Sequence, residues 1–198
     1  DNIYRNGSQY IREKYIPRLC SGELIGALGL TEPGAGSDVL GSMRTSAVKD
    51  GDHYILNGSK TYITNGSIAD IILVYTKTDF KKANRGITAF VVETNNPGFK
   101  IISKLKKMGF RGSQTNELFF EDFRVPAINM IGKEGEGHVT VMNGLDFERA
   151  MIAPISLGIS ERALEISIEY AKIREQFGKP ISSFQMIQSK LADMYTWV

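Results

Sequence analysis

The chain has 198 residues, of which 42% are hydrophobic and 23% are charged, a balance typical of globular proteins. Its net charge of +2 creates no large basic field, which argues against a nucleic-acid-binding protein. The one cysteine, Cys20, excludes an internal disulfide, and the two histidines, His53 and His138, lack the sequence spacing of zinc ligands. No apolar run approaches the roughly 18 residues of a membrane-spanning helix, so we expect no membrane insertion.

The chain begins with a helical pattern. Apolar side chains recur at helical spacing between Ser8 and Leu19, with Ser8 as the expected N-cap and Pro17 as a residue that bends or ends the helix. The period then changes, and the apolar run 24–30, bounded by glycines, predicts a short buried strand.

The segment 28–38 is the most informative part of the chain. Its Gly34 and Gly36 allow the backbone to adopt positive φ and to approach a ligand closely. Consecutive backbone N–H groups in such a turn can bind an anion, and the Ser37 hydroxyl adds a donor. This chemistry suits a pyrophosphate, although an ordinary Pro-Gly turn capped by Asp38 explains the same residues.

Short strand patterns follow, with turn residues between them. The segment 43–48 runs into a hairpin turn at Asp50-Gly51, and a second hairpin is expected at Asn57-Gly58. Further strands are expected over 70–76, 86–93, 99–105 and 115–123. Strands this close together, without helices between them, predict an antiparallel barrel or sandwich.

A long amphipathic helical pattern begins after a linker near 131–137. Val139, Met142, Leu145 and Ile152 fall on one side of it, and Pro154 lies inside it. The expected fold class is therefore α+β, with a β-barrel or sandwich followed by long helices.

Several motifs in order resemble the acyl-CoA dehydrogenase family. They are the segment 28–38, Lys60-Thr-Tyr-Ile-Thr-Asn-Gly66, Met108-Gly-Phe-Arg-Gly-Ser113, Phe119-Phe-Glu-Asp-Phe-Arg-Val-Pro126, Gly144-Leu-Asp-Phe-Glu-Arg149 and Arg174-Glu-Gln-Phe-Gly-Lys-Pro180. The resemblance extends over essentially the whole chain, and Leu-Asp-x-Glu-Arg is most similar to the isovaleryl-CoA dehydrogenase branch. Because family members are longer, it implies an internal portion with three parts: the end of an N-terminal helical domain (1–22), a middle β domain (23–133) and the start of an up-down helical bundle (134–198).

The resemblance implies a flavin-dependent dehydrogenation next to a thioester. Such a reaction needs a carboxylate within reach of the α-proton, and Glu148 matches the position of the base in the isovaleryl-CoA and long-chain branches. Asp146 and Arg149, three residues apart on one helix face, are expected to bind polar parts of the substrate. The alternative is a helix-surface glutamate paired with Arg149 or another neighbour.

The same resemblance implies the FAD contacts. Those expected from the β domain are Leu28, Leu30, Thr31, Gly36, Ser37, Tyr62, Ile63 and Thr64, and those reaching the FAD of a neighbouring subunit are Arg174, Phe177 and Gln185. Tyr62 stands where the family has tryptophan, so the aromatic face is kept but its area changes. Arg174 suits a phosphate because its guanidinium donates in a bidentate fork.

Substrate contacts are expected from both parts of the chain. Ser37 is expected near the thioester end, and Asn84 and Arg85 near the CoA nucleotide. Val139 stands where the isovaleryl branch has tyrosine, which removes a hydroxyl donor and opens space. The acyl chain is therefore left open, between short and branched.

The same resemblance implies three kinds of partner. They are an acyl-CoA substrate, an electron-transferring flavoprotein, and further copies of the chain in a homotetramer. The expected location is the cytoplasm of a bacterium or the mitochondrial matrix of a eukaryote. Two alternatives stay open: an acyl-CoA oxidase or flavin monooxygenase on the same scaffold, and a non-catalytic β-sandwich binding module.

Overall fold

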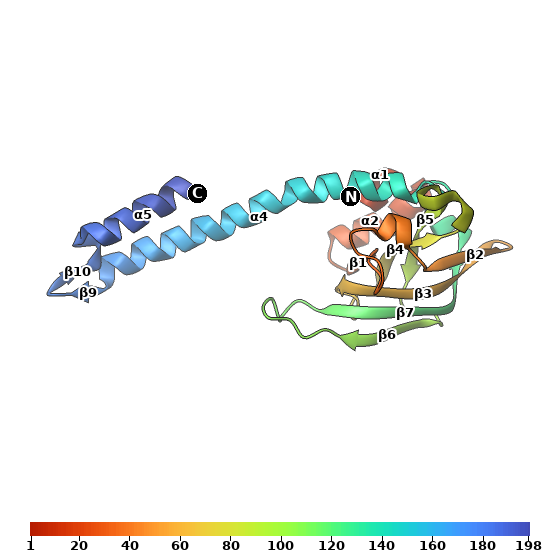
Figure 1. Cartoon of the computed structure of the whole chain (residues 1–198), viewed down its shortest axis with the longest axis horizontal. Helices are drawn as coiled ribbons and strands as arrows, with labels where there is room; N and C mark the ends of the chain where they lie inside the picture. The colour runs from red at the N-terminus through yellow and green to blue at the C-terminus, as the bar shows by residue number, and fades with distance from the viewer. The chain divides into compact units, whose positions relative to one another are not determined.

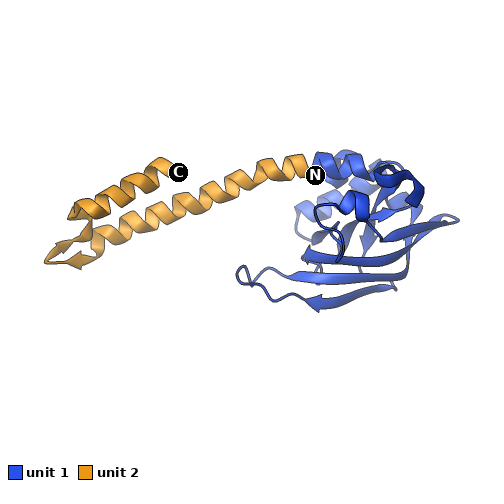
Figure 2. Cartoon of the chain, viewed as in Figure 1, with its two compact units in different colours: residues 1–144 blue, residues 145–198 orange.

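The computed structural model describes residues 1–198, which form two compact units, 1–144 and 145–198 (Figure 2). The elements that begin in the first unit are α1 (Asn2–Asn6), α2 (Gln9–Cys20), β1 (Gly26–Gly29), α3 (Val39–Ser42), β2 (Ser46–Asp50), β3 (His53–Thr64), β4 (Ile71–Lys77), η1 (Phe80–Gly86), β5 (Ile87–Glu93), β6 (Phe99–Lys104), β7 (Thr115–Pro126), η2 (Ala127–Asn129), β8 (Met130–Ile131) and α4 (Gly137–Ile173). Those of the second unit are β9 (Glu175–Gln176), β10 (Lys179–Pro180), η3 (Ile181–Ser183) and α5 (Gln185–Trp197) (Figure 1). The α+β class predicted from the sequence is confirmed.

One sheet dominates the first unit. Its strands lie in the order β6-β7-β3-β2-β4-β5-β8, and β1 pairs with β4 outside this path. The ladders are antiparallel as predicted, except that β1 runs parallel to β4 and β2 makes a single parallel pair with β4. β1, which precedes the segment 31–37, is therefore held by the buried strand β4.

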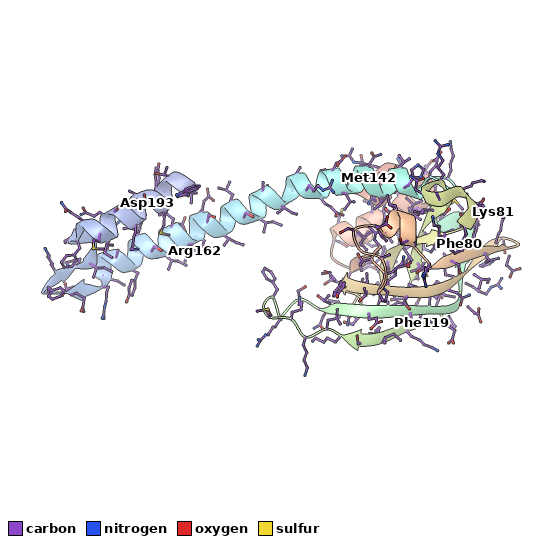
Figure 3. The ribbon with its side chains drawn as sticks, in the orientation of Figure 1. Phe80, Lys81, Phe119, Met142, Arg162 and Asp193 are labelled. Atoms are coloured by element: carbon purple, nitrogen blue, oxygen red, sulfur yellow. The ribbon has the colours of Figure 1, made fainter.

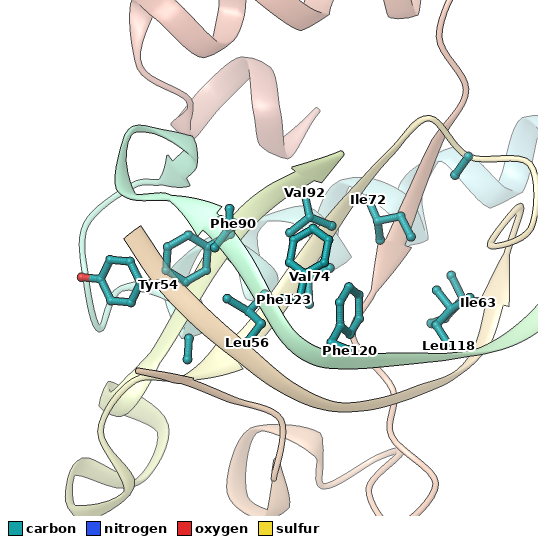
Figure 4. Packing of buried hydrophobic residues seen from close by; sticks show 13 residues of the cluster. Tyr54, Leu56, Ile63, Ile72, Val74, Phe90, Val92, Leu118, Phe120 and Phe123 are labelled. Carbon is teal, nitrogen blue, oxygen red and sulfur yellow. The ribbon is translucent and has the colours of Figure 1, made fainter. Parts of the chain in front are cut away.

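The sheet curls around a single apolar core (Figure 4). The core residues come from β2, β3, β4, β5 and β7: Ala47, Tyr54, Leu56, Ile63, Ala69 (just before β4), Ile72, Val74, Phe90, Val92, Leu118, Phe120, Phe123 and Val125. The rings of Tyr54 on β3 and Phe90 on β5 have centroids 4.9 Å apart, although these strands are not neighbours in the sheet. Contact across the core between distant strands means that the sheet closes toward a barrel.

The first predicted hairpin is confirmed, because β2 turns into β3 at Gly51, whose φ is 61°. The second, at Asn57-Gly58, is wrong: β3 runs unbroken through it. The register against β7 shifts there, and the Asn57 side chain donates to Asp122 Oδ1 (3.1 Å) and accepts from the Asp122 amide (2.8 Å). The extra residue of this β-bulge lies on β7, where Asp122 has a φ of 47°, and Asn57-Gly58 lies opposite it instead of forming a turn.

Helix α2 is anchored to the sheet at its middle. Ser8 accepts from the Ile11 amide, which confirms the predicted N-cap, and the helix contains Pro17 and ends at Cys20. The buried Tyr15 hydroxyl donates to Glu93 Oε1 (2.8 Å), and Lys14 Nζ lies 2.8 Å from the same oxygen. Burial, together with this hydrogen bond to Glu93, raises the pKa of Tyr15 to about 12.

The second unit contains two helical segments joined by a tight hairpin. The hairpin of β9 and β10 turns at Phe177-Gly178, where both residues have positive φ, as a type I′ turn requires. Leu164 and Ala171 are its buried apolar residues, while many others on α4 and α5 are exposed. Although α4 is long, its composition is not apolar enough for a membrane span, and the same holds for every other helix.

The close approach of Gly58 to Thr45 supplies a first prediction. Its φ is 146°, and a Cβ there would lie 2.6 Å from Thr45 Cα. We expect Gly58→Ala to lower the free energy of unfolding of the full-length protein by about 1–3 kcal/mol. Chemical denaturation measures this change. The matched control is Gly34→Ala, where an added Cβ meets nothing within 4 Å and a change of no more than about 0.5 kcal/mol is expected. Equal losses in the two variants would contradict the tight packing of Gly58 against Thr45.

Candidate functional site

The turn 31–37 presents backbone donors to solvent. Glu32 and Ala35 close it by exchanging two backbone hydrogen bonds of 3.0 Å. Gly34, Gly36 and Ser37 are exposed, and their amides donate no hydrogen bond within the chain. The expected positive φ at Gly34 and Gly36 is not adopted, but an added Cβ at either would point into open space. These glycines therefore leave room for a ligand close to the backbone.

The strand segment 60–64 lies against this turn. The Thr61 amide donates to the Thr31 carbonyl (2.9 Å), which joins residues that are thirty positions apart. A second bulge, between Lys60 and Ile63, places Tyr62 at φ 58° with 69% of its side chain exposed. Thr64 is exposed as well. The two motifs therefore adjoin at Thr31 and Thr61, and each carries exposed groups: the free amides of the turn, and the aromatic face of Tyr62 with the Thr64 side chain on the strand segment.

Three of the expected cofactor residues are less accessible. The Ile63 side chain is 2% exposed and belongs to the core, so only its backbone can face a ligand. Leu28 and Leu30 are half-buried at the base of the turn.

A buried ion pair joins the turn to β3. Lys60 Nζ donates to Glu32 Oε1 (2.9 Å) and to the Leu30 carbonyl (3.1 Å), and the side chains of Lys60 and Glu32 are 0% and 6% exposed. Burial lowers the pKa of Lys60 to about 8, against the opposing effect of Glu32. Burial alone would raise the pKa of Glu32, but the Lys60 charge and hydrogen bonds from Thr45 and Arg44 lower it below its usual value.

A cleft of about 860 Å³ borders the same turn. It is lined by Glu32, Pro33, Gly34, Gly41, Ser42, Met43, Arg44, Thr45, Gly58, Ser59, Lys77, Phe80 and Ala83. Phe80 is largely exposed (Figure 3), whereas Lys77 is buried and donates to the Ala83 carbonyl. Burial lowers the pKa of Lys77 against the opposing effect of Asp79.

The other expected substrate residues of the first unit lie elsewhere. Asn84 and Arg85 are exposed in η1, beyond the residues that line the large cleft. Arg85 lines a smaller cleft of about 340 Å³ with Thr78, Asp79, Lys82, Glu134 and Gly135. Val139 is exposed in the first turn of α4.

In the second unit, Asp146 and Arg149 form an ion pair with a separation of 3.3 Å, as their spacing on one helix face predicts. Glu148 is exposed on α4, and its carboxylate has no hydrogen bond or ion pair within the chain. Its exposure is what the alternative of a surface glutamate expects, although Arg149 pairs with Asp146 instead of with Glu148. Glu148 is free to meet a group that the chain itself does not supply.

Residues Arg174, Phe177 and Gln185 lie around the β9–β10 hairpin. Arg174 is exposed at the end of α4, and its carbonyl accepts from the Ile181 amide (2.8 Å). Phe177 has φ 52° and is 93% exposed, with a ring contact to Phe184 at 6.1 Å. Gln185 is exposed at the first position of α5. A bulky residue with positive φ is a strained position of the kind found at ligand sites.

Two family models match this chain: the acyl-CoA dehydrogenase middle domain over residues 27–123 and the acyl-CoA dehydrogenase C-terminal domain over residues 135–198. The chain belongs to the acyl-CoA dehydrogenase family. It is 52% identical to the mitochondrial isovaleryl-CoA dehydrogenase of Pongo abelii over 198 residues, 99% of this chain and 47% of that protein. It therefore spans about half the length of the curated relatives it matches.

Solved structures agree with this membership. Butyryl-CoA dehydrogenase from Megasphaera elsdenii superposes with a TM-score of 0.92 at 49% identity, over 98% of this chain and 51% of that chain. A structure described as PigA with FAD and proline superposes with a TM-score of 0.89 at 35% identity, over 98% of this chain and 51% of that chain.

Sequence reasoning missed Glu32 and Lys60 in this acyl-CoA dehydrogenase chain. The alternation of β3 places Lys60 on the same inner face as the apolar residues Tyr54 and Leu56. A lysine in such an inward position is the signal that could have found the pair. A charge at such a position requires a buried partner of opposite sign.

The Glu32 carboxylate supplies a pH prediction. Because its folded pKa lies below the unfolded value of 4.5, its contribution to stability is complete above pH 4.5 and is lost as the pH falls through the lower folded pKa. We expect Glu32→Gln to cost about 3–5 kcal/mol at neutral pH, because Lys60 is left buried and unpaired. The difference in free energy of unfolding between Glu32→Gln and the wild-type protein should decrease below pH 4.5. Chemical denaturation at several pH values measures this difference.

The control is Glu121→Gln, which removes an exposed ion pair with Lys100 and should cost about 0–1 kcal/mol. A Glu32→Gln loss that stayed constant down to acid pH would show that the carboxylate charge carries none of the effect.

Proposed function

We propose that this chain is part of a flavin-dependent acyl-CoA dehydrogenase that oxidises a short or branched acyl-CoA between the α and β carbons. The observation that carries the proposal is the joining of the turn 31–37 to the segment 60–64 by the hydrogen bond from Thr61 to Thr31 and by the buried Lys60–Glu32 pair. Family membership supplies the chemistry that these segments would serve.

The residues of these segments fit FAD. The free amides of Gly36 and Ser37 and the Ser37 hydroxyl suit an anionic pyrophosphate, and Tyr62 offers an exposed aromatic face to a flat ring system. Thr64 would donate to a ring heteroatom. When bound, FAD would accept the hydride that leaves the β carbon. The structure described as PigA with FAD and proline supports a flavin on this fold.

Glu148 would act as the base that takes the α-proton. An unpaired carboxylate can accept a proton from substrate without first breaking an internal ion pair, and Glu148 has none. Asp146 and Arg149, paired with each other, would bind polar parts of the thioester substrate beside it. Their fixed spacing would orient the α carbon toward the base.

The large cleft beside the turn, about 860 Å³ in volume, is a candidate path for the pantetheine chain because it has both polar and apolar lining residues. Ser37 would meet the thioester end, and Asn84 and Arg85 the nucleotide. Val139, without a hydroxyl, would favour an apolar part of the substrate.

The exposed Arg174, Phe177 and Gln185 would contact the FAD of a neighbouring copy, which implies a homo-oligomer, a tetramer as the family resemblance suggests. An electron-transferring flavoprotein would then reoxidise the enzyme. The location would be the mitochondrial matrix or the bacterial cytoplasm, as for relatives named mitochondrial or found in Bacillus subtilis.

The test uses the full-length protein. We expect it to purify with bound flavin, and a panel of short and branched acyl-CoA substrates to bleach the flavin absorbance. Glu148→Gln should slow this bleaching by roughly 10²–10⁴-fold, the usual contribution of a general base, with flavin content unchanged. Stopped-flow absorbance measures both quantities.

Glu161→Gln is the matched control, because Glu161 is another exposed glutamate on α4 without an ion pair. Bleaching at the wild-type rate in Glu148→Gln would refute the role of this residue. A full-length protein that binds no flavin would instead favour a non-catalytic binding module, and rapid reaction of the reduced, product-bound flavin with oxygen would favour an oxidase.

A further inference from the structure

The Lys60–Glu32 pair holds more than two side chains together. Glu32 Oε2 accepts from the Arg44 amide (2.7 Å), and Oε1 accepts from the Thr45 amide (2.9 Å) as well as from Lys60. One carboxylate therefore connects the turn 31–37, the residues that lead into β2 and the middle of β3. The Leu30 carbonyl, accepting from Lys60 Nζ, adds a fourth attachment just before the turn.

This network is formed by residues next in sequence to the exposed groups of the proposed flavin site. Within the turn, Glu32 precedes the exposed Gly34, Gly36 and Ser37 by two to five positions. On β3, Lys60 is the last residue in register before the bulge that turns Tyr62 outward. The two charged side chains are themselves buried, so they position the ligand-facing groups and do not touch a ligand.

The energetics argue for a positioning role. A buried ion pair is often no more stabilising than apolar residues of similar volume, whereas a single buried charge without its partner is strongly destabilising. Stability alone therefore gives little reason for a charged pair here. Its directional hydrogen bonds, in contrast, fix the spacing between the turn and the bulge, which apolar packing does not.

We propose that Lys60 and Glu32 are positioning residues that set the register between the turn 31–37 and the Tyr62 bulge, and thereby the affinity and redox potential of the bound flavin. This inference rests on the proposed function. It predicts that neutralising both residues weakens flavin binding but leaves protein stability nearly unchanged. The fold tolerates a neutral pair, whereas the arrangement of the exposed donors in the turn 31–37 depends on the charged one.

The test compares Lys60→Met/Glu32→Gln with the wild-type full-length protein. The double variant leaves no buried unpaired charge, so its unfolding midpoint should stay near that of the wild-type protein. Its dissociation constant for FAD, measured by reconstitution of the apoprotein, should rise about 10- to 100-fold, equivalent to the loss of one charge-assisted hydrogen bond. At saturating FAD, its visible absorption band and midpoint potential should differ from those of the wild-type protein.

The control is Tyr15→Phe, which removes the hydrogen bond from a buried tyrosine to Glu93, within the same unit but on α2. It should lower stability and leave FAD affinity unchanged. If the double variant does not fold, Lys60→Arg serves, because it keeps a positive charge beside Glu32 and changes the geometry of the hydrogen bonds to Glu32 and to the Leu30 carbonyl.

A folded variant with wild-type FAD affinity, spectrum and potential would overturn the positioning role and leave the proposed function intact. A wild-type full-length protein that binds no FAD would overturn both.

Discussion

The position of the turn 31–37 against the sheet depends on one buried ion pair between Lys60 and Glu32. The turn 31–37 has few apolar side chains and cannot be held by packing, so its place against the sheet is set by hydrogen bonds. Three of these converge on the Glu32 carboxylate, and another joins Thr61 to Thr31. The pair is enclosed because the curled sheet and its apolar core exclude water from Lys60.

The parts of the structure that the sequence predicts are those with local signals. Alternation along β2, the Asp50-Gly51 turn and the Ser8 cap each depend on residues within a few positions, and each is confirmed. The segment 28–38 also has a local signal for anion binding, whereas the cofactor role of 62–64 is implied by the family resemblance alone. The two segments adjoin through the hydrogen bond from the Thr61 amide to the Thr31 carbonyl. A contact between residues thirty positions apart cannot be predicted from composition or from either motif alone.

The rest depends on contacts between residues far apart in the sequence. Asn57-Gly58 has the composition of a turn, yet Asn57 pairs with Asp122, sixty-five positions away, and the dipeptide lies in β3 opposite a bulge on β7. Lys60 and Glu32 are twenty-eight positions apart in the sequence. The only sign of their pairing in the sequence is a charged residue at an inward-facing position of β3. Gly34 and Gly36 permit positive φ, but neither residue adopts it. Their lack of a side chain instead leaves open space beside the backbone. Glu148 has no partner within the chain, so its role depends on groups beyond it.

The central claim is that the exposed backbone of the turn 31–37 forms a flavin site together with the bulge at Tyr62. Hydrogen–deuterium exchange of the full-length apoprotein, with and without added FAD, tests it most directly. The amides of Gly34, Gly36 and Ser37, free of acceptors within the chain, should exchange rapidly without FAD and become protected with it, together with those near Thr64. Protection confined to other segments, with these amides still exchanging rapidly under saturating FAD, would contradict the account.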